Sequence, residues 1–284
     1  GLAATAVRRK RADRRAARQH HRPAVRTAAL GEPVLSGGGR SVGAMFERVR
    51  DMPRAIVAHK GDDPLAYERA VQWTLAHSQR LGGHQLLYVP GKRNFQDEPV
   101  LVGMSKRVTV ATWKTLSNAR WGGGLVLAAW PTEKHLADID GDRRTSALCV
   151  LSWAPTDTAA WASAHQPELL SPGAPAAPPP TIADPVVVEG MKTLTVLVNH
   201  ANNLAGAMDR RDAVNVLLTL HDAGHQLEPD QLYAWALANG WPAGGATRLK
   251  EFAVQIAGGH RPRADRGALR PDILEVWRRE ATGA

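Results

Sequence analysis

The chain has 284 residues, of which 44% are hydrophobic and 22% are charged, and this composition excludes a wholly disordered protein. No apolar run approaches the roughly 20 residues of a membrane-spanning helix. The first thirty residues contain no apolar segment of a secretory signal. We therefore expect a cytoplasmic protein with no membrane partner.

The single cysteine, Cys149, lies in the apolar run Ala147–Leu151. One cysteine excludes a disulfide within the chain and argues against a cysteine-based zinc site. A thiolate nucleophile needs an electropositive and partly exposed setting, so we interpret Cys149 as a small buried hydrophobe. We expect neither a metal nor a cofactor.

The formal net charge of +9 is concentrated at the beginning of the chain. Residues 1–30 contain nine basic residues and one acid, Asp13, so they carry +8 and leave only +1 for the other 254 residues. A cluster of arginines neutralises phosphates and releases counterions, which gives sequence-independent binding to DNA or RNA. The residues that we expect to bind nucleic acid are Arg8, Arg9, Lys10, Arg11, Arg14, Arg15, Arg18 and Arg22.

Two other interpretations of this basic segment stay open. It is a solubilising terminus without a partner, or it binds an anionic membrane surface. The membrane is disfavoured because the segment lacks aromatic and aliphatic anchors. Ser36–Gly39 is rich in glycine and follows as a flexible linker. We predict a disordered tail and linker over residues 1–40 and an α/β domain over residues 41–170.

Short apolar runs alternate with stretches of helical type in the predicted α/β domain. The runs that predict strands are Ala55–Ala58, Gln85–Val89, Val108–Thr112, Leu125–Trp130 and Ala147–Trp153. Strands that are apolar on both faces and alternate with helices are typical of a parallel sheet covered on both sides. The predicted fold class is α/β, with a mostly parallel, Rossmann-like three-layer sheet of about five strands, followed by a small all-helical domain.

Helix starts are visible between these strands. Asp63 is a typical N-cap before a proline at the first helical position, and it predicts a helix over Leu65–Arg80. Pro131–Glu133 begins a second helix, and Pro155–Asp157 begins a third. Lys92–Met104 is irregular, so we expect a long loop there with at most a short helix.

The run Ser171–Pro180 marks a boundary, because proline lacks an N–H and restricts its φ angle. We predict a Pro/Ala linker over residues 171–183 and a helical domain over residues 184–284. The helices predicted in this domain are Pro185–Asn199, Arg210–Ala223, Pro229–Asn239, Gly245–Ala257 and Arg270–Glu280. The third and fourth of these form a pair in which Thr247, Arg248 and Lys250 would face DNA in a helix-turn-helix protein. We favour an ordinary helical hairpin, because the connecting turn is longer than that motif uses.

Tryptophans and cations follow several of the predicted strands. Parallel α/β sheets bind ligands outside the carboxyl ends of their strands. There, tryptophan rings beside cations would form a stacking platform with phosphate-binding neighbours. The alternative is that the rings pack helices onto the sheet, and the usual burial of tryptophan favours it. The residues of this candidate ligand rim are Lys92, Arg93, Trp113, Lys114, Trp130 and Trp153.

Other motifs in the sequence do not meet the requirements of known sites. Pro90–Lys92 follows a strand but lacks the spacing of a phosphate-binding loop, and Gly122–Gly124 precedes its strand. His221 and His225 do not make a zinc-protease motif, because Gly224 is expected to end the helix between them.

A row of aspartates, Asp138, Asp140 and Asp142, is expected to form a solvated turn between a helix and the next strand. The start of the row is similar to a calcium-binding loop. The glutamate that such a loop needs at its twelfth position is replaced by Cys149.

Four runs carry a resemblance to known proteins: VLAAWP (126–131), ALCVLSW (147–153), AAWASA (159–164) and PDQLYAWALANGW (229–241). They resemble an uncharacterised family of α/β-plus-helical proteins from high-GC bacteria, over roughly residues 60–260. No activity, cofactor or catalytic residue is assigned to that family, so the resemblance implies a fold and no function.

Three functional hypotheses follow. The first is a non-catalytic accessory or regulatory protein that contacts nucleic acid through the tail, with the rim as a second surface. The second is an enzyme that binds a small molecule or nucleotide at the rim, with Lys92, Arg93 or Lys114 holding an anionic substrate. The third is a protein-interaction module in which the helical domain binds a partner protein through an exposed apolar patch.

Overall fold

The computed structural model describes residues 51–58, 63–173, 175–264 and 269–283. The predicted basic tail and its glycine linker, from Arg8 to Gly39, lie outside the described residues. Among the helices that are described, none has the length and apolar character needed to cross a membrane.

The first part of the described chain folds around one parallel sheet. The strands are β1 (Arg54–Ala58), β2 (His84–Tyr88), β3 (Thr109–Ala111), β4 (Gly124–Ala129), β5 (Thr145–Ser152) and β6 (Glu168–Leu169). Their order is β3-β2-β4-β5-β1-β6, and each neighbouring pair of strands in this order is parallel. The predicted α/β class and the five predicted strands are confirmed. The sixth strand was missed because it has only two residues.

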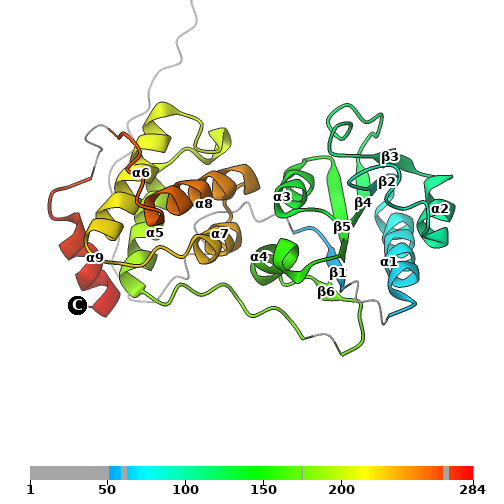
Figure 1. Cartoon of the computed structure of the whole chain (residues 1–284), viewed down its shortest axis with the longest axis horizontal. Coiled ribbons are helices and arrows are strands. Elements are labelled where there is room, and N and C mark those ends of the chain that lie inside the picture. The colour runs from blue at the N-terminus through cyan, green and yellow to red at the C-terminus, as the bar shows by residue number, and fades with distance from the viewer. Residues whose placement is uncertain (1–50, 59–62, 174, 265–268, 284) are drawn as a thin grey trace, which may run out of the picture. The chain divides into compact units, whose positions relative to one another are not determined.

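Two helices cover each face of the sheet (Figure 1). Helices α1 (Ala66–Leu81) and α2 (Pro99–Ser105) lie on one face, and α3 (Glu133–Gly141) and α4 (Pro155–His165) lie on the other. Side chains alternate between the two cores, as the pleat of a strand requires. Leu125 and Leu127 pack with the α1 side, whereas the intervening Val126 packs with the α3 side. The three-layer arrangement is therefore confirmed.

Some local predictions in this region need correction. Helix α1 begins at Ala66, because Asp63 caps a turn that precedes the helix: its Oδ1 accepts from the Leu65 N–H at 3.1 Å. Asp138 and Asp140 do not lie in a solvated turn, because α3 continues through both of them and Asp142 is its C-cap.

The glycine that begins β4, Gly124, allows β4 to pack closely against β2. A Cβ atom at Gly124 would lie 2.2 Å from the carbonyl oxygen of His84, and the φ angle of Gly124 is +141°. Only glycine allows β4 to approach β2 this closely. The predicted absence of a phosphate loop at Gly122–Gly124 is consistent with this role.

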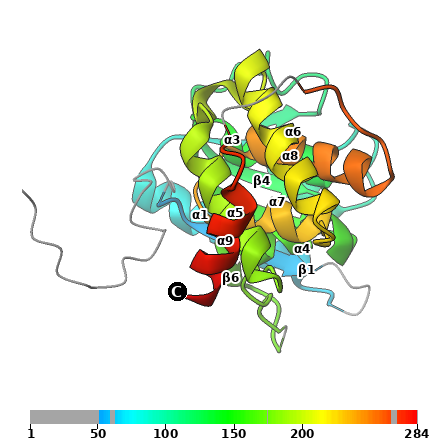
Figure 2. The same cartoon turned by 90° about the vertical axis from the view of Figure 1, so that its left-hand side faces the viewer.

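The remaining elements, from Pro185 onward, are all helical, and we call this part the helical region. They are α5 (Pro185–Leu197), the short 3-10 helix η2 (His200–Asn202), α6 (Ala207–Asp222), α7 (Pro229–Ala238), α8 (Ala243–Ala257) and α9 (Ile273–Thr282). Figure 2 shows α9 beside α5, and the two helices are in contact. Proline occupies the first turn of α2, α4, α5 and α7, where its missing N–H has no intrahelical partner to lose.

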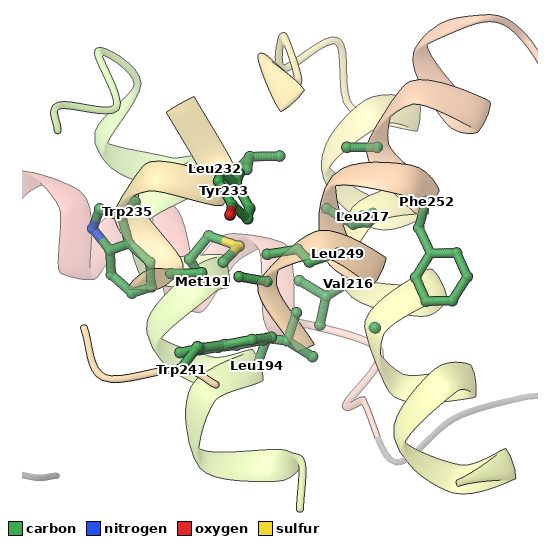
Figure 3. Close-up of a cluster of buried hydrophobic side chains, with 14 of the residues drawn as sticks. Met191, Leu194, Val216, Leu217, Leu232, Tyr233, Trp235, Trp241, Leu249 and Phe252 are labelled. Atoms are coloured by element: carbon green, nitrogen blue, oxygen red, sulfur yellow. The ribbon is translucent and has the colours of Figure 1, made fainter. Parts of the chain in front are cut away.

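A single large core holds the helical region together. Figure 3 shows side chains from α5, α6, α7 and α8 converging in it, among them Met191, Val216 and Leu249. Two buried tryptophans donate hydrogen bonds to threonines of α5. The Nε1 of Trp241 donates to Thr195 at 3.0 Å, and that of Trp277 donates to Thr193 at 2.8 Å. These bonds satisfy the only polar atoms of large apolar side chains.

The end of α6 confirms one prediction. The helix ends at Asp222, so His225 does not share a helical face with His221. His225 instead contacts Asp184, the N-cap of α5, with 2.6 Å between its Nδ1 and the carboxylate Oδ2. The pair closes α6 onto the start of α5 and has no zinc-protease geometry.

Lys250 of α8 joins the helical region to α3. Its Nζ lies 2.6 and 2.9 Å from the carboxylate oxygens of Glu133 and 2.7 Å from Asp230 of α7. The ammonium also lies 5.4 Å from the ring centroid of Tyr233. Ala137 of α3 packs into the core of the helical region, which adds apolar contact at the same junction.

A buried ionic cluster lies at the amino end of β1. Arg54 donates to both carboxylate oxygens of Asp140, at 2.8 and 3.3 Å, and His165 of α4 lies 3.3 Å from the same carboxylate. The side chains of Arg54, Asp140 and His165 are only 9%, 9% and 8% exposed. Burial lowers the pKa of His165 to about 4, although Asp140 opposes this shift.

We expect Lys250→Met to lower the free energy of unfolding by about 1–2 kcal/mol, because Glu133 loses its partner in a partly buried setting. Lys192→Met is the matched control, since Lys192 pairs with Glu189 in the same helix at i,i+3. This second change should cost at most about 0.5 kcal/mol. Urea denaturation followed by circular dichroism measures both. Equal losses for the two variants would show that the Lys250 junction adds nothing.

We expect acid to destabilise the protein through His165. The folded-state pKa of about 4 lies below the ordinary value of 6.5, so the unfolded chain takes up the proton first. The free energy of unfolding therefore falls as the pH drops from about 6.5 to about 4, by up to about 3 kcal/mol. His165→Gln should remove this part of the pH dependence, whereas His260→Gln at an exposed position should retain it. Urea midpoints across this pH range test the expectation, and identical pH profiles for the two variants would contradict it.

Candidate functional site

All of the candidate rim residues lie at the carboxyl edge of the sheet, and we keep the name strand-end rim for Lys92, Arg93, Trp113, Lys114, Trp130 and Trp153. Trp113 and Lys114 follow β3, Lys92 and Arg93 follow β2, Trp130 follows β4, and Trp153 follows β5. These four strands are consecutive neighbours in the sheet. Neighbouring strands lie about 4.8 Å apart, so the rim extends about 14 Å across the sheet.

The connections between strands reverse their direction across the sheet within the rim. From β2 the chain passes through α2 to β3 on one side, and from β4 it passes through α3 to β5 on the other side. Adjacent strands whose connections leave in opposite directions and over opposite faces create a crevice, and open α/β sheets bind ligands there. The residues after β2 and β4, Lys92 and Trp130 among them, flank this switch point.

Trp113 presents its ring to solvent. It is 55% exposed and lies in a tight turn in which the Thr115 N–H donates to the Thr112 carbonyl at 2.9 Å. The Lys114 Nζ lies 5.0 Å from the ring centroid, within range of a cation–π interaction. His135 of α3 stacks on the ring, with 6.2 Å between centroids and 15° between planes.

Trp130 and Trp153 form a second aromatic group. Trp130 has a left-handed backbone, with φ of 52°, and its N–H donates to the Leu151 carbonyl at 2.8 Å. Its half-buried ring meets Trp153 edge-to-face at 6.3 Å and Tyr67 edge-to-face at 6.2 Å. Trp153 is 64% exposed. The half-buried Trp130 therefore holds the exposed ring of Trp153 in place.

The sequence left two roles open for the tryptophans, packing of helices onto the sheet and a stacking surface for a ligand. The structure divides the tryptophans into buried and exposed ones. Trp121, which precedes β4, is buried and donates from Nε1 to the His84 carbonyl at 3.1 Å, which is a packing role. Trp130 also packs. Trp113 and Trp153 are exposed, and packing alone does not account for their positions.

The cations of the rim are exposed. Lys92 and Arg93 lie in the turn after β2. Among the residues that the structure describes, Lys92, Arg93 and Lys114 form no ion pair with a carboxylate. Their positive charge is therefore not neutralised within the described part of the rim.

His135 was missed by the sequence reasoning. Thr132 caps α3, its Oγ1 accepting from the His135 N–H at 3.4 Å and lying 3.0 Å from the His135 Nδ1. Burial lowers the pKa of His135, and Asp138 opposes this shift only in part, so the ring is neutral at pH 7. The only signal in the sequence was the spacing from Thr132, which marks a helix start but does not reveal the ring contacts.

Tyr88 at the end of β2 adds a polar atom beneath the switch point. Its ring centroid lies 5.8 Å from that of His135. Burial raises the pKa of the Tyr88 phenol, with a contribution from Asp138. The hydroxyl is buried and has no hydrogen-bond partner among the described side chains and backbone.

Two hollows lie away from the rim. One, of about 540 Å³, is lined by residues at the amino ends of β2 and β3 and by α1 and α2, including Leu75, His84 and Arg107. The other, of about 440 Å³, lies in the helical region beside Arg210 and Arg263. Neither hollow provides the concave pocket at the strand ends that the enzyme hypothesis requires.

The remaining motifs are accounted for by packing. Cys149 is fully buried in β5, and burial raises the pKa of its thiol, so its interpretation as a core residue is confirmed. In α8, Lys250 is bound to acidic residues and Thr247 donates to the Ala243 carbonyl at 2.9 Å. Two of the three side chains that a recognition helix would offer to DNA are thus occupied. No cluster of three or more metal-ligating side chains was found in the described part of the chain.

Large exposed apolar side chains also occur in the helical region. They are Val196 and Leu197 of α5, Met208 of α6 and Val254 of α8. They come from three helices, and nothing in the structure joins them into one patch.

Comparisons with known proteins give one partial match. Residues 183–278 match the family profile of a domain of unknown function (DUF1889). This match covers the helical region and supports the resemblance to an uncharacterised family there. No curated protein and no solved structure matches the chain.

Proposed function

We propose that this is a non-catalytic accessory or regulatory protein of a bacterial cytoplasm that binds single-stranded nucleic acid. In this proposal the strand-end rim stacks unpaired bases. The basic tail, from Arg8 to Arg22, neutralises backbone phosphates.

The exposure of Trp113 and Trp153 carries the proposal. Each ring keeps more than half of its surface in water, at the edge where parallel sheets bind ligands. Every nucleic-acid base has a π-face, so exposed tryptophans bind unpaired bases with little sequence preference. Aromatic neighbours hold both side chains in place, His135 beside Trp113 and Trp130 beside Trp153.

The charges of the rim fit the same ligand. Lys92, Arg93 and Lys114 have no carboxylate partner among the described residues and lie between or beside the two aromatic groups. A strand that stacks its bases on the rings would place its phosphates near these cations. The +8 charge of residues 1–30 adds a second attraction that does not depend on sequence.

A second candidate is an enzyme that binds a nucleotide or another small anion at the same rim. The observation in its favour is that the His135 ring lies 5.8 Å from the ring of Tyr88, whose hydroxyl is buried, at the switch point. A neutral imidazole near a phenol has the composition of an acid–base pair. This candidate requires an activity that His135→Gln abolishes without weakening oligonucleotide binding.

The test is the affinity for a fluorescein-labelled oligothymidine, measured by anisotropy on full-length protein. We expect Trp113→Ala and Trp153→Ala each to weaken binding by about 1–3 kcal/mol, the value of one stacked base. Trp113→Phe and Trp153→Phe should restore most of the loss, because phenylalanine keeps an aromatic face. Binding should also weaken steeply as salt rises.

Matched controls separate stacking from general loss of apolar surface. Leu81→Ala and Val254→Ala truncate exposed apolar side chains elsewhere and should leave the affinity unchanged. Replacing the eight basic tail residues by glutamine measures the contribution of the tail in the full-length chain. Unchanged affinity in both Trp→Ala variants would refute the role of the rim, and unchanged affinity in the tail variant would refute the role of the tail.

A further inference from the structure

The helical region contains a hollow with an unusual set of side chains. Its volume is about 440 Å³, and it is lined by Arg210, Arg211, Arg263, Met208 and three alanines. The lining comes from the first turns of α6 and from the segment after α8. We call it the arginine hollow. It lies apart from the strand-end rim and shares no residue with it.

Among the residues that the structure describes, two of the three arginines have no acidic partner. Arg210 lies 5.9 Å from the ring centroid of Phe252, and Arg263 is exposed. Neither forms an ion pair within the described ranges of the chain. The described residues that line the hollow include no carboxylate. Three positive charges therefore face one hollow, and Asp212 partly neutralises the charge of Arg211.

Other arginines of the same region are paired. Arg261 contacts both carboxylate oxygens of Asp222, at 2.7 and 2.6 Å, and Arg270 contacts Asp272 at 3.0 and 2.6 Å. Arg210 and Arg263 differ from these two arginines, because neither contacts a carboxylate among the described residues.

The acids of α6 beside Arg210 and Arg211 are already engaged. Asp209, in the first turn of α6, is buried, and its carboxylate accepts from the Asn199 N–H at 2.8 Å and from the side-chain amide of Asn202. Asp212 is buried and accepts from the Nε of Arg211 at 2.9 Å. The second contact holds the Arg211 side chain in place.

We propose that the arginine hollow binds a phosphate-bearing small molecule. Planar guanidinium groups match the oxygens of phosphate and hold them with paired, charge-assisted hydrogen bonds. A multiply charged anion relieves the repulsion among three guanidinium groups. The volume lies within the range of about 300–1,000 Å³ that small ligands occupy. The cations gather in one hollow, whereas a nucleic-acid backbone requires a track of cations.

The test uses pyrophosphate as the probe and full-length protein labelled with 13C at the methionine methyl groups. The chain has five methionines, and Met208 lines the hollow with 66% of its surface exposed. Its signal is assigned with Met208→Leu. At constant ionic strength, we expect pyrophosphate to shift the Met208 methyl signal saturably. The signal of Met191, which is buried in the core, should not move and reports that the fold is intact.

Charge variants locate the binding. Arg210→Gln and Arg263→Gln should each raise the Kd of pyrophosphate about tenfold, the factor for one hydrogen bond to a charged group. Arg270→Gln is the matched control, because it removes the same charge from an arginine paired outside the hollow. It should leave the Kd unchanged.

Three results would overturn the proposal. The first is the absence of a saturable Met208 shift, and the second is an equal loss of affinity in Arg270→Gln. The third is a shift produced by oligothymidine and not by pyrophosphate, which would assign the hollow to a nucleic-acid backbone. Since these readouts do not involve the rim, they are independent of the proposed binding of bases there.

Discussion

Parallel pairing of the strands is the constraint on which the rest of the structure depends. A parallel pair needs a crossover connection, and such crossovers place helices on the faces of the sheet. Here α1 and α2 take one face, and α3 and α4 take the other. Parallel strands also bring all their carboxyl ends to one edge. The exposed tryptophans Trp113 and Trp153 share that edge for this reason.

The two candidate sites use different physical means. The rim offers aromatic faces and scattered cations across four strand ends, which suits a flexible chain with exposed bases. The arginine hollow offers three guanidinium groups in a confined space, which suits a compact anion. In the two proposals, recognition of flat rings is therefore separate from recognition of a compact anion. The ionic cluster of Arg54, Asp140 and His165 belongs to neither site, because it is buried at the amino end of β1, away from the rim.

Local sequence patterns predicted the helices and strands. Contacts between residues far apart in the sequence could not be predicted from such patterns. The runs around Leu125–Trp130 and Ala147–Trp153 were recognisable because strands buried on both faces are continuously apolar. Asp140 was misplaced in a turn, because its partner Arg54 lies 86 residues earlier and gives no local signal. His135 and the hollow around Arg210 and Arg263 went unnoticed for the same reason. The rim was placed at the correct edge, yet the sequence did not distinguish the buried Trp121 from the exposed Trp113.

The junction at Lys250 has a consequence for the rim. Glu133, which Lys250 holds, and His135, which stacks on Trp113, belong to the same turn of α3. A shift of that turn would break the ion pair between Lys250 and Glu133. This contact between α8 and α3 therefore also restrains the position of His135. The aromatic surface is thereby pre-organised, and a ligand that stacks on it loses less conformational entropy in ordering the protein.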